Sequence, residues 1–224
     1  MATKTKSTSK ASSKTKVTPK RIMDSYTKYL LLEGKQPPSV FKFADDLGIS
    51  EREFYTHFTS FDSIEKKIWE DLMNETLHAL EKDSKYANFN AREKLLSFYY
   101  THIEVLKGKR SFIMMRWSGL KDNMKTPEPL RGYKDHFLKY AKSIIVDGIN
   151  GDEIKERTFI SDRYNQALWL QLLFVIDYWI KDTSTDFEQT DAAIEKAVNL
   201  SFELLSESTL DRAIDFVKFL WQTK

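Results

Sequence analysis

The chain has 224 residues, of which 41% are hydrophobic and 13% aromatic, so it can bury a sizeable core as one small and one larger domain. Its formal net charge is only +2, and it contains no cysteine, which excludes disulfides, thiol nucleophiles and thiolate metal sites. The longest apolar run covers residues 167–180 and is interrupted by Gln171 and Asp177, so it is too short to span a membrane. We expect a cytoplasmic protein.

Residues 1–18 are predicted to form a disordered basic tail. Residues 1–21 carry six Lys and one Arg with no acidic residue, a charge of +7, and a segment so rich in Lys, Ser and Thr cannot bury a core. One interpretation is an arm that tracks DNA. The others are a solubilising extension and an acid-poor targeting peptide, although the Arg-rich amphipathic face of such a peptide is missing.

The first helix is predicted to run from Pro19 to Gly34. Thr18 is a suitable N-cap residue, and proline is favoured at the first helical position because its missing N–H would have no partner there anyway. The apolar stripe of this helix consists of Ile22, Tyr26, Tyr29 and Leu30.

Two short amphipathic segments follow, and a glycine separates them. In the first segment Phe43, Ala44 and Leu47 share one helical face. Gly48 supplies the positive φ angle that ends this helix, and Ile49 then fills the turn. The pattern predicts the first helix and the turn of a helix-turn-helix motif.

The second segment begins with a capping box, in which Ser50 is the N-cap and Glu53 follows three residues later. Phe54 and Phe58 lie at i and i+4 and are predicted to face the core. The outward residues are then Glu51, Arg52, Tyr55 and His57. A short helix with an apolar base and long polar side chains pointing outward has the geometry that enters a DNA major groove.

The rest of the chain also has the periodicity of helices. Ser60 is predicted to cap a longer helix with apolar residues at positions 61, 64, 68 and 72. Further helices are predicted at residues 91–107, 110–120, 129–147, 158–181, 191–206 and 210–222. The sequence therefore predicts an all-α fold.

This order of helices resembles the TetR family of bacterial transcriptional regulators. The resemblance covers roughly residues 19–75 and is carried by Ile22, Tyr29, Gly34, Phe-Ala-Asp-Asp-Leu-Gly-Ile-Ser at 43–50, Tyr-Thr-His-Phe at 55–58, and Ser60. It implies a helix-turn-helix DNA-binding domain at residues 19–62 and a helical ligand-binding and dimerisation domain at residues 63–224. Because residues 158–181 and 191–206 are apolar on more than one face, they suit a four-helix homodimer interface.

The expected partner of the small domain is operator DNA. The candidate DNA-binding residues are Lys16, Lys20, Arg21, Ser39, Lys42, Glu51, Arg52, Tyr55 and His57. Residues 22–58 contain four basic and six acidic residues, a net charge of −2, so contacts to the DNA backbone would come largely from the tail. Glu53 is read either as a helix cap or as a sign that the site has drifted away from DNA, since its carboxylate competes for the helix N-terminus.

The expected partner of the larger domain is a small apolar ligand. Its candidate binding residues are Tyr99, His102, Phe112, Met115, Trp117, Trp169, Phe174 and Tyr178. Aromatic and Met side chains at helical spacing also occur as ordinary core packing. The four histidines have no metal-ligand spacing, so we expect no metal, no cofactor and no enzymatic activity.

Together these patterns predict a homodimeric repressor that a ligand releases from its operator. The alternative is a TetR-fold protein that binds small molecules or lipids and has lost specific DNA binding. The amphipathic segment 210–222 fits either packing within the protein or contact with a membrane surface. In this architecture the chain also resembles the lipid-binding accessory proteins of ubiquinone biosynthesis, which have the TetR fold.

Overall fold

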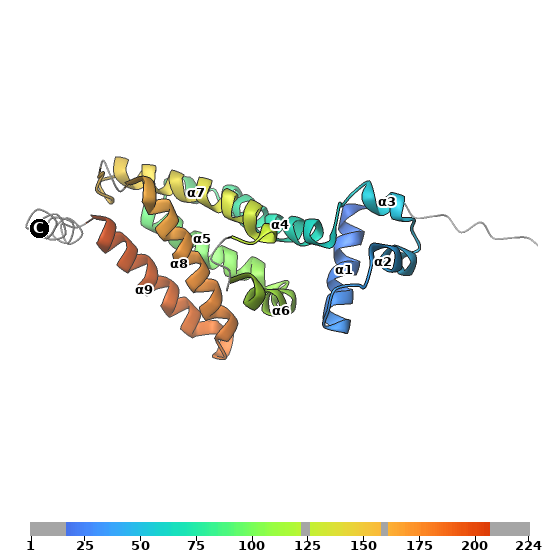
Figure 1. The fold of residues 1–224 in the computed structure, drawn as a ribbon. Coiled ribbons are helices and arrows are strands. Elements are labelled where there is room, and N and C mark those ends of the chain that lie inside the picture. The colour runs from blue at the N-terminus through green and yellow to red at the C-terminus, as the bar shows by residue number, and fades with distance from the viewer. Residues whose placement is uncertain (1–16, 122–125, 158–160, 207–224) are drawn as a thin grey trace, which may run out of the picture.

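The structure is a computed structural model that describes residues 17–121, 126–157 and 161–206 (Figure 1). Lys16 and the predicted helix 210–222 lie outside the described residues. The fold is all-α, as the sequence predicts, and the described residues contain no strand. None of the described helices is long and apolar enough to cross a membrane.

The small domain consists of α1 (Pro19–Glu33), α2 (Val40–Leu47) and α3 (Glu51–Tyr55). The predicted N-cap of α1 is confirmed, because Thr18 Oγ1 accepts a hydrogen bond from the backbone N–H of Arg21 at 3.2 Å. Gly34 and Gly48 end α1 and α2 with φ angles of 68° and 70°, which a residue with a Cβ adopts only at a cost.

The capping box of α3 is also present. Ser50 Oγ accepts a hydrogen bond from the backbone N–H of Glu53 at 3.2 Å, and Glu53 Oε2 accepts one from the backbone N–H of Ser50 at 2.9 Å. The apolar base of α3 is Phe54, which is fully buried and lies edge-on to Phe43 and Phe61, with ring centroids 6.1 Å apart in both pairs. These aromatic contacts fix α2 and α3 to each other and to the start of α4.

The larger domain contains α4 (Phe61–Lys82), α5 (Ala91–Lys107), α6 (Arg110–Lys121), α7 (Arg131–Asn150), α8 (Ser161–Lys181) and α9 (Glu188–Ser206). Single 3-10 turns precede α5, α7 and α9 at Tyr86–Asn88, Glu128–Leu130 and Thr185–Phe187. Helix α7 therefore begins two residues after its predicted start at residue 129. Helix α9 begins three residues before its predicted start at residue 191. In Figure 1, α8 and α9 lie side by side along the end of the molecule opposite the small domain.

Two polar clusters join the ends of these helices. Both carboxylate oxygens of Asp182 accept hydrogen bonds from the backbone and side chain of Ser184 and Thr190, which anchors the start of α9. Burial raises the pKa of Asp182, but these four hydrogen bonds outweigh it and lower the pKa to about 2. Arg110 of α6 donates to the carbonyl oxygen of Trp179 at 3.1 Å and stacks on the indole of that residue.

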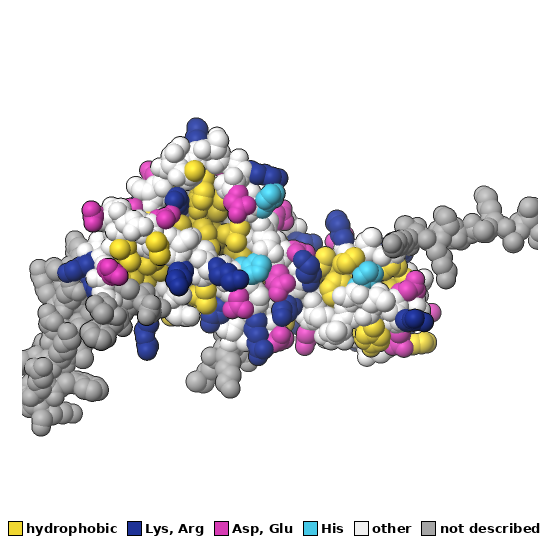
Figure 2. Space-filling model, turned by 90° about the horizontal axis from the view of Figure 1, so that it is seen from above, with side chains coloured by type: hydrophobic (Ala, Val, Ile, Leu, Met, Phe, Trp, Pro, Cys, Tyr) yellow, Lys and Arg dark blue, Asp and Glu magenta, His cyan; other side chains and the backbone are white. Residues whose placement is uncertain are grey.

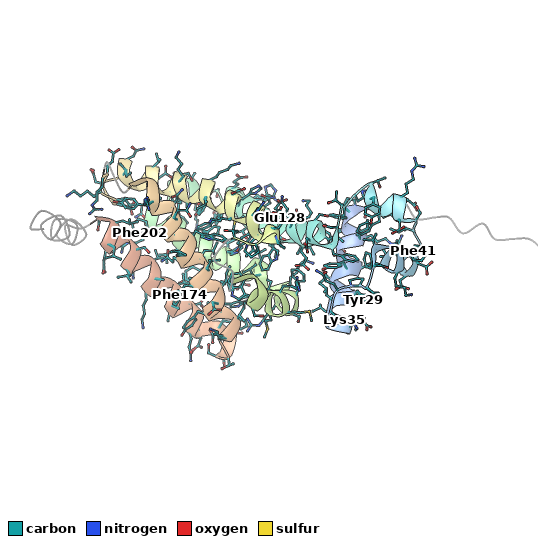
Figure 3. The ribbon with its side chains drawn as sticks, viewed as in Figure 1. Tyr29, Lys35, Phe41, Glu128, Phe174 and Phe202 are labelled. Atoms are coloured by element: carbon teal, nitrogen blue, oxygen red, sulfur yellow. The ribbon has the colours of Figure 1, made fainter. Side chains whose placement is uncertain are left out.

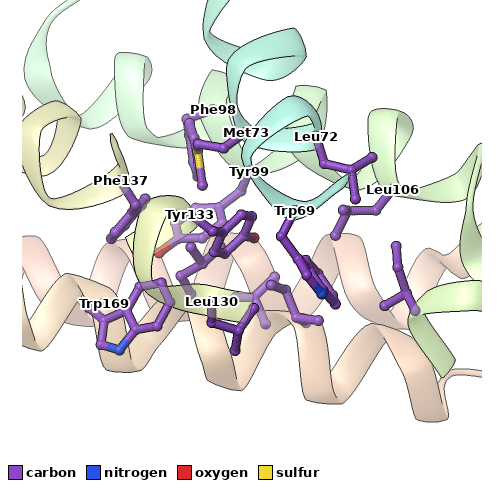
Figure 4. Close-up of a cluster of buried hydrophobic side chains, with 14 of the residues drawn as sticks. Trp69, Leu72, Met73, Phe98, Tyr99, Leu106, Leu130, Tyr133, Phe137 and Trp169 are labelled. Carbon is purple, nitrogen blue, oxygen red and sulfur yellow. The ribbon is translucent and has the colours of Figure 1, made fainter. Parts of the chain in front are cut away.

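The core of the larger domain is rich in aromatic rings. Trp69 of α4 lies 5.5 Å from Tyr133 of α7, and Tyr133 in turn lies 6.0 Å from Trp169 of α8, measured between ring centroids (Figure 4). Phe98 of α5 and Phe137 of α7 are fully buried beside them. One continuous aromatic cluster therefore connects α4, α5, α7 and α8.

Candidate DNA-binding surface and ligand-binding region

The predicted DNA-binding residues of α3, and His57 in the turn just after it, lie on the exposed side of the small domain. Glu51, Arg52, Tyr55 and His57 are all exposed, and 52% of the surface of Tyr55 is accessible. The short α3 is held from beneath by Phe54, so its outer side chains project from a fixed base. Figure 1 places α2 and α3 at the end of the molecule opposite α8 and α9.

Most predicted cations of this surface have partners within the small domain. Lys20 forms an ion pair with Asp24 at 3.0 Å, and Lys42 forms one with Asp46. Arg21 donates to the carbonyl oxygen of Leu47 at 3.2 Å, which ties α1 to the end of α2. Because exposed ion pairs contribute only about 0 to 1 kcal/mol, a phosphate can displace the acidic partner of either lysine.

The two remaining predicted residues, Ser39 and Arg52, have different roles in the structure. Ser39 caps α2, since its Oγ accepts a hydrogen bond from the backbone N–H of Lys42 at 3.1 Å. Among the described residues no carboxylate lies within ion-pair distance of Arg52. On the face seen in Figure 2, acidic and basic side chains are interspersed over the small domain rather than gathered in one basic patch.

The predicted ligand-binding residues fall into two separate groups. Tyr99, His102, Phe112, Trp117 and Trp169 are buried in the aromatic core, and Met115 packs against that core. Phe174 and Tyr178 instead line a groove of about 730 Å³ formed by α8 and α9, and Phe174 is 52% exposed (Figure 3). The structure therefore does not bring the eight residues together into one site.

The polar tips in the buried group already have partners within the protein. Tyr99 donates to Gln171 Oε1 at 3.1 Å, and Trp117 Nε1 donates to Asp177 Oδ1 at 3.3 Å. The indole N–H of Trp69, which is completely buried in the same cluster, has no hydrogen-bond partner. An unpaired buried donor of this kind disfavours the empty core, so it is a group that an acceptor on a ligand would satisfy.

His102 is held as a neutral imidazole. The hydroxyl of Thr76 donates to the carbonyl oxygen of Leu72 at 3.0 Å, so it must accept its 2.7 Å hydrogen bond from His102 Nδ1. His102 Nε2 is then the acceptor for the hydroxyl of Tyr133 at 2.5 Å. Burial lowers the pKa of His102 to about 3, and its role in this network is structural.

A family model of the tetracyclin repressor-like C-terminal domain matches residues 94–220, which is more than half of the chain. This chain belongs to the TetR family. The helix-turn-helix formed by α2 and α3 lies before the matched region. It belongs to the part of the sequence that carries the resemblance to the family.

Solved structures resemble this TetR-family chain over most of its length. One is a putative TetR-family transcriptional regulator from Syntrophomonas wolfei, with a TM-score of 0.65 and 14% identity over 83% of this chain and 93% of that chain. Another is the transcriptional regulator FadR from Bacillus subtilis in complex with stearoyl-CoA, with a TM-score of 0.62 and 20% identity over 82% and 97% of the two chains. A third is a Rhodococcus protein of unknown function, with a TM-score of 0.60 and 11% identity over 88% and 100%. At these identities the likeness shows the fold alone. A comparison with curated proteins finds no match.

The structure of this TetR-family member also shows a buried polar cluster between the two domains that the sequence did not reveal. Glu65 of α4 has no exposed surface and accepts hydrogen bonds from Tyr26 Oη at 2.6 Å, Gln36 Nε2 at 3.3 Å and Arg116 Nε at 2.9 Å. Burial and the bond to Glu65 raise the pKa of Tyr26. This cluster connects α1 and the loop after it with α4 and α6, so it joins the small domain to the larger one.

A second unpredicted feature is a groove of about 430 Å³ between α4, α5 and α7. Its apolar lining includes Leu80, Tyr140 and Ile144, and an ion pair between Lys94 and Asp147 at 2.6 Å lies at its edge. The sequence gives no signal for it, because its residues come from three helices that are far apart in the chain. Among the described residues no cluster of acidic and histidine side chains could hold a metal ion.

Proposed function

We propose that this chain is a ligand-responsive TetR-type repressor that binds operator DNA as a homodimer in the cytoplasm. The observation that carries the proposal is the capped helix-turn-helix at one end of the molecule, with Arg52, Tyr55 and His57 exposed on it. Fold alone does not specify function, so the argument rests on this surface and on the face of α8 and α9 that no other described helix covers.

The proposed dimer interface is the outer face of α8 and α9. Exposed apolar side chains concentrate there, with Leu170 at 65%, Phe174 at 52% and Leu200 at 56% of their surface accessible. Small residues, Ala192, Ala193 and Ala197, line the groove between these side chains and would let a second pair of helices approach closely. Two copies joined through this face would present two recognition helices to DNA, as paired half-sites require.

We propose that an apolar ligand without a strong charge releases the repressor. The aromatic core between α4 and α8 supplies large apolar surface and the unpaired indole donors of Trp69 and Trp179. A ligand that binds there would favour a spacing of the recognition helices that no longer fits two adjacent major grooves. Linkage then requires operator DNA to weaken ligand binding by the same factor. FadR from Bacillus subtilis binds stearoyl-CoA, whose acyl chain is long and apolar, so uncharged long-chain acyl compounds are the first class to test here.

The second candidate function is a carrier of small molecules or lipids without specific DNA binding. The observation that favours it is the lack of a basic patch on the small domain: residues 22–58 carry a net charge of −2, and Lys20 and Lys42 are paired with Asp24 and Asp46. Binding to a duplex of the upstream region of the gene and to a scrambled duplex, at two salt concentrations, separates the two functions. Preference of about a thousandfold for the upstream duplex supports the repressor, whereas weak, equal and salt-sensitive binding supports the carrier.

Arg52→Ala is expected to weaken binding to a specific operator by about 1 to 3 kcal/mol and to change binding to random duplex little. The reason is that Arg52 has no ion-pair partner among the described residues and projects from the recognition helix. Fluorescence anisotropy with both duplexes measures the difference. Equal losses on the two duplexes would rule out base recognition by Arg52.

Phe174→Glu is expected to convert the homodimer into a monomer at micromolar concentration, because it places a charge in the centre of the proposed apolar interface. Sedimentation velocity measures the change in mass. Val146→Glu is the matched control, since Val146 is a comparably exposed apolar residue, 47% accessible, on α7. If the control dissociates and Phe174→Glu does not, the interface lies elsewhere.

A further inference from the structure

Phe41 is exposed in a way that the fold of the small domain does not explain. It lies in the first turn of α2 and 66% of its surface is accessible, whereas Phe43 and Ala44 of the same helix are buried. A position two residues before Phe43 is about 200° away around a helix, so Phe41 points away from the core. Its burial therefore requires something outside the domain.

The exposed ring belongs to the same end of the molecule as the recognition helix. The contact between Phe43 and Phe54 fixes α2 against α3, and Figure 3 shows Phe41 on the side of α2 away from the larger domain. In a helix-turn-helix the first helix crosses the DNA backbone beside the groove that the second helix enters. Phe41 lies two residues before Phe43, the residue that contacts α3, so the first turn of α2 lies next to the helix expected to enter the groove.

The charges around Phe41 favour an apolar contact over a cationic one. Its neighbour Lys42 is paired with Asp46, and Asp45 adds a second exposed carboxylate to α2. Arg52, which has no ion-pair partner among the described residues, lies on α3. In the major groove the C5 methyl of thymine is the apolar group, and phenylalanine is one of the side chains that contact it.

We propose that Phe41 recognises a thymine methyl group in each operator half-site and so helps to set the sequence preference. This inference rests on the proposed function, because it requires operator binding. It assigns to α2 a contact with a base, in addition to those expected from Arg52 and Tyr55 of α3. The methyl group and the ring would each lose exposed apolar surface in the complex.

The test uses the full chain and an operator taken from its upstream region or selected from random duplexes. Each thymine of one half-site is replaced singly by deoxyuridine, which removes only the methyl group. We expect one replacement to weaken wild-type binding about fourfold, the value of one buried methyl-sized group. Phe41→Ala should weaken binding to the thymine operator about tenfold or more and abolish the sensitivity to that deoxyuridine.

Leu32→Ala is the matched control, since Leu32 is an apolar residue of α1 that is 72% exposed, and it should leave operator binding unchanged. Thermal unfolding of both variants should match the wild type because neither side chain is buried. The assignment is overturned if Phe41→Ala keeps the operator preference of the wild type, or if the deoxyuridine effect persists in Phe41→Ala. Either result leaves the proposed regulator function unchanged. No preferred sequence at all overturns the proposed function together with the assignment.

Discussion

Arg116→Ala is expected to lower the free energy of unfolding by about 3 kcal/mol, because it removes the cation that faces a fully buried carboxylate. Glu65 has no exposed surface, and its oxygens accept hydrogen bonds from Arg116, Tyr26 and Gln36. Without Arg116 the two neutral donors remain, but the negative charge of Glu65 would be buried without a counter-ion. The Arg116 side chain is 30% exposed, so we expect the low end of the range for a buried pair.

Urea denaturation followed by circular dichroism measures this loss. Lys67→Ala is the matched control, because the ion pair of Lys67 with Asp71 is exposed and should contribute less than about 1 kcal/mol. Combining Glu65→Gln with Arg116→Met removes both charges and should recover most of the stability, since the cost lies in the unpaired charge. Equal effects of Arg116→Ala and Lys67→Ala would mean that the buried carboxylate has another source of compensation.

The same cluster is where the two domains are coupled. Tyr26 belongs to α1 of the small domain, Glu65 to the connecting helix α4, and Arg116 to α6. A ligand that shifts α6 must either carry α1 with it or break the hydrogen bonds of a buried charge, and the second course is costly. A movement in the larger domain is therefore expected to reach the small domain through Glu65.

The sequence predicts the small domain well because its signals are local. Thr18, Gly34, Gly48 and the Ser50 capping box act within one helical turn, and each has its expected role in the structure. Glu65 is different, because its partners are 29 to 51 positions away in the chain. A glutamate between Ile64 and Ile68 carries no local sign that it will be buried and paired.

The predicted ligand-binding residues show a second property that helical periodicity in the sequence does not reveal. A helix that is apolar on several faces, such as α8, does not reveal from sequence which face enters the core. Trp169 is buried, but Phe174, five positions later, is half exposed on the opposite face toward α9. The sequence predicts that both side chains pack against something, and only the tertiary structure separates the core from the proposed dimer interface.

His102 is expected to make the stability of the protein depend on pH in the range where only histidine titrates. Burial lowers the pKa of His102 from 6.5 to about 3 in the folded state. Below pH 6.5 the unfolded chain binds a proton that the folded protein does not, so the free energy of unfolding falls as the pH falls. The slope is about 1.4 kcal/mol per pH unit well below pH 6.5, which amounts to a loss of about 2 kcal/mol at pH 5. Above pH 6.5 this contribution is constant.

The measurement is the free energy of unfolding in urea at several values between pH 5 and pH 7, above the range in which Asp182 titrates. In His102→Gln the average slope between pH 5 and pH 7 should fall by about 1 kcal/mol per pH unit, with most of the change below pH 6.5, whatever the absolute stability of the variant, because the titrating group is gone. His78→Gln should keep the wild-type slope, since His78 is exposed on α4. A wild-type slope that survives in His102→Gln would mean that His102 takes up its proton in the folded state as well. The donor of Tyr133 would then have to turn away from His102 Nε2, and the neutral network of Thr76, His102 and Tyr133 would have to rearrange inside a closed core.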